Sequence, residues 1–256
     1  MQRDSATYMF VFAAIVCVVC AVLVSGSAVS LKQRQEDNAA FDKQQNVLFA
    51  AGLASREQGF SRDELTTMFE ERVEPVVISL ETGSPVDGVD PETYDMEKAA
   101  TGPEGVDAPA NQSSIKRLPQ NAVVYNVKDD RGETMMVVLP IKGYGLWSTL
   151  YGFLAVDADG TTIRGITYYQ HGETPGLGGE VDNPSWKAKW PGRQIYDDGG
   201  DVEIEVIKGQ AGPPSSDPYN VDGLSGATIT SRGVTNMLQF WLGENGFGPY
   251  LEQLRS

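Results

Sequence analysis

Residues 222–231 read Asp-Gly-Leu-Ser-Gly-Ala-Thr-Ile-Thr-Ser and combine glycines with hydroxyl side chains. The two glycines allow backbone conformations that other residues resist, so amide N–H groups in this stretch can converge on one point. Thr228, Thr230 and Ser231 are residue types that begin helices. A glycine-rich turn that leads into a helix N-terminus offers free amide donors and a partial positive charge, which suits a phosphate group. The alternative is a tight turn and a capped helix that bind nothing, and the spacing alone leaves both open.

The elements around this stretch follow from hydrophobic spacing. Apolar residues at intervals of three and four predict a helix over residues 230–242: Val234, Met237, Leu238, Trp241 and Leu242. Upstream, short runs of β-forming residues predict five strands: Val123–Val127, Thr134–Ile141, Tyr151–Val156, Ile163–Tyr169 and Val202–Ile207. Turn sequences at 129–132 and 157–160 join successive strands as hairpins. The sequence therefore predicts an α+β domain over residues 122–256, with a mainly antiparallel sheet flanked by helices.

Two further glycine-rich clusters lie beside these strands. Residues 143–148, Gly-Tyr-Gly-Leu-Trp-Ser, would let a flat ring lie close to the backbone, or would form a loop around a buried tryptophan. Residues 171–179, His-Gly-Glu-Thr-Pro-Gly-Leu-Gly-Gly, form no regular element, and a lone His next to Glu is more often a loop residue than a catalytic dyad. We see no nucleophile–base pair and no set of metal ligands. We therefore expect no catalytic residues and no metal site, but a domain that binds a flat, phosphorylated molecule.

The N-terminal part of the chain is apolar. No charged residue lies between Asp4 and Lys32, and a helix needs about 20 apolar residues to cross the hydrocarbon layer. We predict a short tail at residues 1–7 and a transmembrane helix at 8–31. A cleaved signal peptide is the alternative, because small residues follow at 25–28, but the apolar run exceeds the usual length of about 7–15 residues. Basic residues flank both ends, so the positive-inside rule does not decide the orientation.

Both cysteines, Cys17 and Cys20, fall within the predicted membrane helix. A C-x-x-C pair can bind a metal or cycle between redox states, but no third ligand candidate accompanies it here. We interpret both as small packing residues. The formal net charge of −15 argues against a nucleic-acid partner, because an acidic surface repels phosphate backbones.

The segment 32–121 separates the membrane helix from the predicted domain. We expect a polar helical stalk at 32–46, followed by two short amphipathic helices, the second capped by Ser61 and Glu64. Residues 81–121 are acidic and rich in Gly and Pro. Because their carboxylates lack the alternating spacing of a calcium loop, we interpret this part as a solvated excursion rather than a metal-binding loop.

Four motifs resemble a known family. Residues 222–228 resemble the flavinylation motif of FMN-binding domains, D-G-x-[ST]-G-A-T, in which the last threonine carries FMN as a phosphoester. That threonine corresponds to Thr228. Residues 173–178, Glu-Thr-Pro-Gly-Leu-Gly, are similar to a second signature of the same domain. Residues 143–148 and 243–249 resemble the C subunits of sodium-translocating NADH:quinone reductases (NQR), a family of proteins with this domain.

The resemblance implies a covalent FMN and a set of residues around it. Thr228 would hold the phosphate, and Lys208 is either a second phosphate contact or a solvated lysine. Asp222 is expected either to form the turn or to be recognised by the flavin transferase that attaches FMN. The other expected neighbours of the flavin are Ser225, Gly226, Ala227, Thr174, Leu177 and Trp147.

The same resemblance implies an electron-carrying subunit of a six-subunit respiratory complex. The complex would oxidise NADH, reduce ubiquinone to ubiquinol and move Na⁺ from the cytoplasm to the periplasm, and the subunit alone would have no complete activity. The implied partners are the other NQR subunits, the flavin transferase and membrane lipid. The implied location is the bacterial inner membrane, with a single span and a periplasmic C-terminal domain.

Two alternatives remain. One is the matching flavinylated subunit of the Rnf ferredoxin:NAD⁺ complex, which shares the flavinylation motif, although residues 143–148 and 243–249 favour the quinone reductase. The other is a membrane-anchored domain that binds a phosphorylated ligand without a covalent bond. Flavin that stays with the denatured protein distinguishes the two flavinylated subunits from this non-covalent domain.

Overall fold

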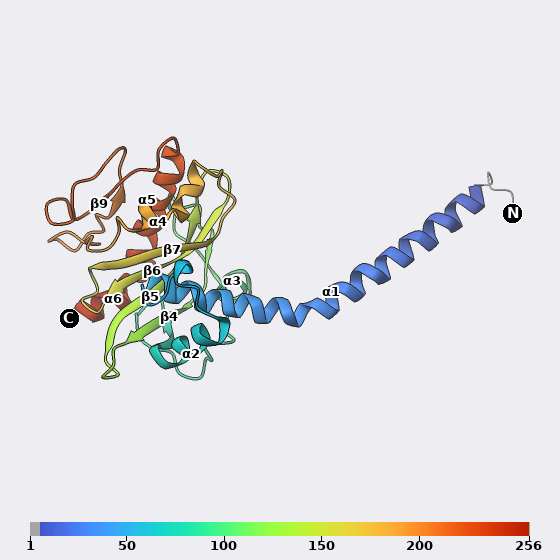
Figure 1. Cartoon of the computed structure of the whole chain (residues 1–256), viewed down its shortest axis with the longest axis horizontal. Helices are drawn as coiled ribbons and strands as arrows, with labels where there is room; N and C mark the ends of the chain where they lie inside the picture. The colour runs from blue at the N-terminus through green and yellow to red at the C-terminus, as the bar shows by residue number, and fades with distance from the viewer. Residues whose placement is uncertain (1–5, 256) are drawn as a thin grey trace. The chain divides into compact units, whose positions relative to one another are not determined.

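The computed structural model describes residues 6–255 and divides into two compact units, residues 1–43 and 44–256. Helix α1 (Ala6–Ala50) contains the predicted membrane span, and of the predicted tail at 1–7 the first five residues lie outside the described part (Figure 1). Among the described helices, α1 is the one long and apolar enough to cross a membrane. Its side chains Phe10 and Val22 are 77% and 65% exposed. Such a surface is stable in lipid rather than in water.

The end of α1 differs from the expectation. The predicted stalk at 32–46 is helical, but it continues α1, and the first predicted amphipathic helix is the last turn of α1 rather than a separate element. Val47 and Leu48 on that turn are fully buried within the second unit. The helix ends before Gly52, whose φ of +69° breaks the helical path.

Helix α2 (Arg62–Arg72) begins with the predicted capping box. Ser61 Oγ accepts a hydrogen bond from the Glu64 amide at 3.3 Å, and the Glu64 carboxylate accepts one from the Ser61 amide at 2.8 Å. The helix runs directly into β1 (Val73–Ser79), which pairs antiparallel with β4. The expected stalk segment therefore supplies an edge strand of the sheet, and the second compact unit begins at Gln44.

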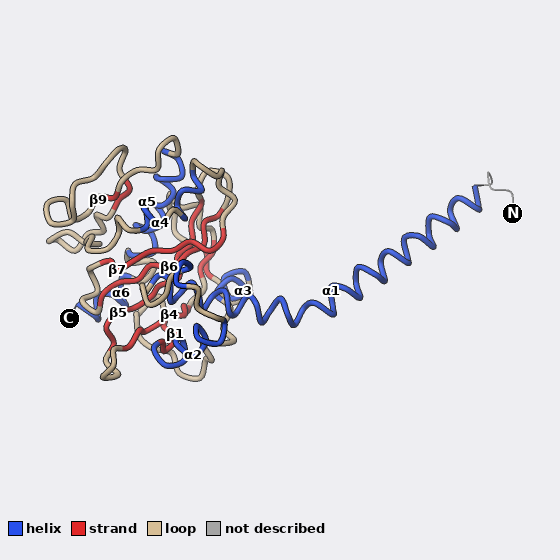
Figure 2. Tube along the Cα trace, in the orientation of Figure 1, coloured by secondary structure: helices blue, strands red, loops and turns tan. Residues whose placement is uncertain are grey.

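The sheet confirms the predicted α+β architecture. Its order is β1-β4-β5-β6-β7 and every neighbouring pair is antiparallel (Figure 2). The four later strands are β4 (Asn121–Lys128), β5 (Thr134–Tyr144), β6 (Thr149–Asp157) and β7 (Ile163–Gln170). Two of the three hairpins turn at the predicted positions, where Gly132 and Gly160 adopt φ of +83° and +67°.

Both faces of the sheet are covered. On one face, Leu139, Ile141 and Leu154 pack in the core cluster that also holds the buried side of α5 (Thr228–Leu242). On the other, Tyr125 forms edge-to-face ring contacts with Phe153 and with Phe69 of α2. Burial on both faces explains why the strand sequences are almost continuously apolar.

Short elements complete the unit. They are η1 (Arg56–Gln58), α3 (Met96–Thr101), β2 (Val106–Asp107), β3 (Arg117–Leu118), η2 (Gly178–Asp182), α4 (Pro184–Lys187), β8 (Glu205–Val206), β9 (Asn220–Val221) and α6 (Gly248–Arg255). Two predictions are wrong here. Residues 81–121 are not simply a solvated excursion, because the Arg117 guanidinium bonds the carbonyl groups of Ala100 and Gly105 and Leu118 is buried. The predicted strand 202–207 shortens to β8, which pairs parallel with β9, because the chain before it folds back onto Ile195.

Candidate functional site

The three hydroxyl residues at the N-terminus of α5, Thr228, Thr230 and Ser231, differ in exposure and in hydrogen bonding. The helix begins at Thr228, two residues before the predicted start, and Ala227 at the N-cap has no side-chain cap. Thr230 is fully buried and Ser231 nearly so. The Thr230 hydroxyl donates to Glu173, and the Ser231 hydroxyl accepts a hydrogen bond from the Leu224 amide in the turn before the helix. Thr228 is exposed, and its hydroxyl has no partner among residues 6–255. Thr228 is therefore the hydroxyl of the three that a reagent can reach.

In the turn before the helix, the amides of Leu224 and Ala227 are hydrogen-bonded, whereas those of Ser225 and Gly226 have no acceptor among residues 6–255. Gly226 has a φ of +72°, which turns the chain into α5. Gly223 lies against the Ile207 carbonyl, where a Cβ has no room, and its amide donates to Gly209 at 2.9 Å. An uncapped helix N-terminus of this kind carries a partial positive charge and free N–H donors.

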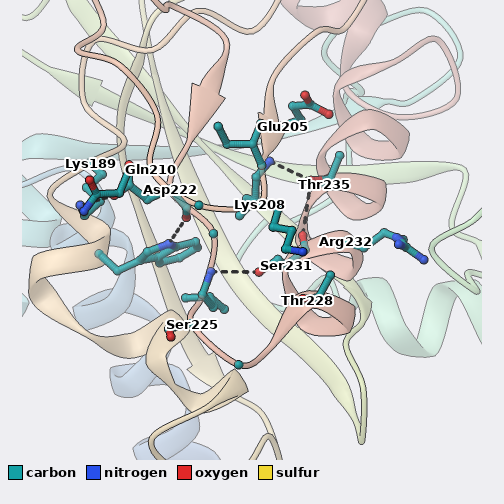
Figure 3. Close-up of a pocket in the computed structure, with 17 residues that line it drawn as sticks. Lys189, Glu205, Lys208, Gln210, Asp222, Ser225, Thr228, Ser231, Arg232 and Thr235 are labelled. Carbon is teal, nitrogen blue, oxygen red and sulfur yellow. Dashed lines mark hydrogen bonds and ion pairs between the residues drawn. The ribbon is translucent and has the colours of Figure 1, made fainter.

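A cavity of about 780 Å³ opens beside this turn (Figure 3). Ser225, Gly226 and Thr228 line it on one side, and Lys208, after β8, lines it on the other. Figure 3 shows the Lys208 side chain reaching toward the first turn of α5, and Arg232 of that helix also lines the cavity. Neither cation forms an ion pair with another described residue. The cavity thus combines a free hydroxyl, open amides and unneutralised positive charge, a donor set that fits a phosphate monoester or diester.

Asp222 lines the cavity and is hydrogen-bonded to two other segments of the chain. Its carboxylate accepts hydrogen bonds from Lys189 Nζ at 2.5 Å and from the Ala211 amide at 3.1 Å, and its carbonyl oxygen accepts one from Trp186 Nε1 at 2.8 Å. Burial would raise the pKa of Asp222, but the bonds from Lys189 and Ala211 outweigh burial and hold that pKa below its ordinary value. The side chain is therefore an ionised structural contact.

Glu173, which belongs to the 171–179 cluster, connects the 143–148 cluster to the 222–231 stretch. Its Oε1 atom accepts hydrogen bonds from three consecutive amides of the β5–β6 hairpin turn, Leu146 at 3.1 Å, Trp147 at 2.9 Å and Ser148 at 3.2 Å. Its Oε2 atom accepts one from Thr230 Oγ1 at 2.7 Å. Glu173 is only 5% exposed, so its charge is buried. A buried charge is costly without hydrogen bonds, so each of these contacts stabilises the ionised carboxylate.

These contacts set the pKa of Glu173. Burial would raise it, but the hydrogen bonds from Thr230 and from the amides of Trp147, Leu146 and Ser148 together hold the pKa below its ordinary value. A carboxylate that accepts several charge-assisted bonds stays ionised. The site therefore holds a fixed negative charge between the hairpin turn and α5.

Two glycines make room for this carboxylate. A Cβ at position 145 would lie 2.7 Å from Glu173 Oε1, and a Cβ at position 178 would lie 2.6 Å from both Glu173 Oε2 and Thr230 Oγ1. Both distances are far below van der Waals contact, and the neighbours are fixed by hydrogen bonds. The glycines of two sequence motifs are thus explained by one residue, a role that the sequence signals only through the glycines themselves.

The expected neighbours of a flavin ring are exposed around this arrangement. Trp147 is 66% exposed, so the alternative of a loop around a buried tryptophan is wrong, and Leu177 is 43% exposed. Leu177 lies against the motif turn, since a Cβ at Gly226 would be 2.9 Å from Leu177 Cδ2. Exposed Thr174 accepts hydrogen bonds at its carbonyl from Leu177 and Gly179. Trp147, Leu177 and Thr174 do not line the cavity beside Thr228, whereas Ser225 and Gly226 do, and Ala227 is buried.

The remaining motif residues lie elsewhere. His171 is a loop residue after β7, as expected, with Nε2 3.0 Å from Asp182 and Nδ1 accepting a bond from the Glu173 amide. Residues 243–249 form the turn after α5 and the first two residues of α6, and buried Phe247 in this turn packs on the ring of Trp241. That motif supports the core rather than the site. Within residues 6–255, no three His, Cys, Asp or Glu side chains are grouped as metal ligands would be.

Comparison with known proteins gives concordant matches. The model of the FMN-binding domain family matches residues 145–243. The chain is 48% identical to the C subunit of the Na⁺-translocating NADH-quinone reductase of Pseudomonas aeruginosa, over 99% of this chain and 98% of that protein. It is 45% identical to the same subunit of Yersinia pestis, over 99% and 95%. Among solved structures, Shewanella oneidensis NqrC matches 87% of this chain and 99% of its own with a TM-score of 0.76 and 36% identity. The corresponding protein from Parabacteroides distasonis matches 86% and 96% with a TM-score of 0.67 and 30% identity.

Proposed function

This chain belongs to the family of C subunits of Na⁺-translocating NADH-quinone reductases, and we propose that it carries one FMN bound covalently through a phosphoester to Thr228. Its FMN-binding domain and its membership of an oxidoreductase complex are established by the family. The covalent bond and the residues around it are our proposal. When bound, the isoalloxazine would supply electron transfer, and the protein would supply position and electrostatics.

One observation supports Thr228 above the other two hydroxyl residues at the start of α5. It is exposed at the first position of an uncapped helix, while Thr230 and Ser231 are buried and hydrogen-bonded. The phosphate ester would keep a negative charge, and the open amides and helix dipole stabilise that charge at this position. Ester formation requires the flavin transferase and a donor whose FMN phosphate carries a leaving group.

The neighbouring residues have distinct proposed roles. Lys208, without an ion-pair partner in the described chain, would offset the phosphoester charge from across the cavity. Ser225, Gly226 and Ala227 would form the turn that the phosphate contacts. The flat surface of Trp147 and the side chain of Leu177 would flank the ring, with Thr174 at the base of the same loop. Electron transfer needs no general acid or base, so no catalytic side chain is proposed.

At the level of the complex, we propose an electron carrier between redox centres of partner subunits. The six-subunit assembly would oxidise NADH, reduce ubiquinone to ubiquinol and move Na⁺ to the periplasm. Helix α1 would cross the inner membrane once, over residues 8–31, and the second unit would lie in the periplasm. In place of a domain boundary at residue 122, we propose that the flavin-bearing unit begins at Gln44, because β1 belongs to its sheet.

Mass spectrometry of the protein made with its flavin transferase tests the site. The peptide that contains Thr228 should carry one FMN, and in-gel flavin fluorescence should persist after denaturation. Thr228→Ala should abolish both signals, Thr228→Ser should retain an attachment oxygen, and Ser215→Ala, at an exposed serine that does not line the cavity, should keep both signals. An adduct that persists in Thr228→Ala would refute the assignment.

A further inference from the structure

Three segments lie around Thr228: the β5–β6 hairpin turn, the first turn of α5 and the loop after β7. Glu173 forms hydrogen bonds to the first two segments and belongs to the third. We propose that Glu173 is a positioning residue, which holds the exposed side chains of Trp147 and Leu177 at a fixed place relative to Thr228. The inference rests on the proposed function for what these side chains flank. The positioning itself is a property of the protein without cofactor.

The two carboxylate oxygens of Glu173 bind different segments. Oε1 accepts the three amides of the hairpin turn, and Oε2 accepts the hydroxyl of Thr230, which lies two residues after Thr228 on α5. A carboxylate offers acceptor sites only, so both oxygens can be used in this way, whereas an amide would offer one acceptor and two donors. A single ionised group therefore fixes the backbone that carries Trp147 against the helix that carries Thr228.

The loop that follows Glu173 is held in a tight turn by its own backbone hydrogen bonds. The Thr174 carbonyl accepts hydrogen bonds from the amides of Leu177 at 3.1 Å and Gly179 at 2.9 Å, which closes a tight turn. Leu177 projects from this turn onto Gly226. Since Glu173 is the residue before Thr174, its bond to α5 also places Leu177 against the turn before Thr228.

The space around the Glu173 carboxylate is too small for a side chain at two neighbouring positions. Gly145 and Gly178 both pack against it, and a methyl group at either position would enter the volume of its oxygens. Glycine at both positions therefore leaves the room that the charged carboxylate occupies. These glycines also provide variants that disturb the group without removing its charge.

The test uses the full-length protein in detergent, expressed with and without the flavin transferase. In the flavin-free form, hydrogen exchange at the amides of residues 146–148 reports the hairpin turn directly. We expect Glu173→Gln to speed this exchange by about tenfold or more, because one set of donors loses its ionised acceptor. Glu244→Gln, an exposed glutamate away from the site, should exchange as the wild type does.

In the flavinylated form, the visible circular dichroism of the flavin and its reduction potential report the positioning. Glu173→Gln should lose most of the induced dichroism and shift the potential, and Gly178→Ala should do the same with the charge retained. If Glu173→Gln does not fold, Thr230→Val removes one donor while keeping the shape, and it should reduce the dichroism to a smaller extent. Unchanged exchange and dichroism in the folded variants would overturn the inference.

The two proposals fail separately. A wild-type protein that carries no FMN on Thr228 refutes the proposed function, and faster exchange in Glu173→Gln would still support the positioning. A wild-type protein with the adduct and a Glu173→Gln variant with wild-type exchange and dichroism refute the positioning alone.

Discussion

Lys189 Nζ lies 2.5 Å from Asp222 Oδ2, and this ion pair connects the segment after α4 to the first residue of the flavinylation motif. The Asp222 side chain is 13% exposed, and the same carboxylate binds the Ala211 amide. Of the two roles expected for Asp222, the structural one is therefore visible in the fold. Recognition by the flavin transferase is a separate question, and a substitution separates the two roles.

Asp222→Asn should lower the free energy of unfolding by about 1–2 kcal/mol, because two hydrogen bonds to a charged group are weakened. Denaturant unfolding measures this loss, and Asp198→Asn is the control at an exposed aspartate. The folded variant should still accept FMN, at a reduced rate. A variant as stable as the wild type that accepts no FMN would instead assign Asp222 to recognition by the transferase.

The buried carboxylate of Glu173 should make stability depend on pH. Its pKa in the folded protein is below the ordinary value of 4.5, so its stabilising effect is complete above that value and is lost as the pH falls through the folded pKa. The wild type should therefore lose more unfolding free energy than Glu173→Gln when the pH is lowered from about 6 to about 3. The difference between the two curves isolates Glu173 from the other carboxylates, and parallel curves would contradict the prediction.

Lys208→Ala should slow flavinylation without affecting the fold. Lys208 is exposed, so the change in unfolding free energy should stay within about 0.5 kcal/mol. The rate of FMN transfer should fall several-fold at low salt and less at high salt, because ions screen the same charge. Arg232 also lines the cavity, so Arg232→Ala should slow the transfer as well, whereas Lys116→Ala, at an exposed lysine that does not line the cavity, should have no effect. An equal fall in all three variants would point to net charge alone.

Truncation should separate the membrane segment from the folded unit. Removal of residues 1–43 should release the protein from the membrane fraction and leave the stability of the second unit unchanged. Removal of residues 1–50 should cost several kcal/mol, because Val47 and Leu48 are fully buried and each such side chain contributes about 1.5–3 kcal/mol. Thermal unfolding of the two truncated proteins measures the difference. Equal stability would show that the last turn of α1 is dispensable.

Local sequence pattern was sufficient for the parts of this protein that are decided by local physics. The apolar run, strands β4 to β7, helix α5 and the capping box at Ser61 all follow from periodicity and turn chemistry, because each element must bury one face or satisfy its own backbone. Hydroxyl residues commonly cap helices, so the sequence predicts that α5 begins at residue 230, two residues after its actual start at Thr228. Thr230 instead binds a group from another part of the chain.

The pairing of polar groups from distant segments depends on the tertiary structure. Thr230 and Glu173 lie 57 residues apart in sequence, yet their bond buries the Thr230 hydroxyl, whereas Thr228 in the same helical turn is exposed. The pairing of β1 with β4 and the folding of 202–204 onto Ile195 are likewise contacts between distant segments. Sequence spacing determines which face of an element is buried. The partner of a buried charge depends on the packing of the whole unit, because an ionised group is stable there only where several donors from different segments converge on it.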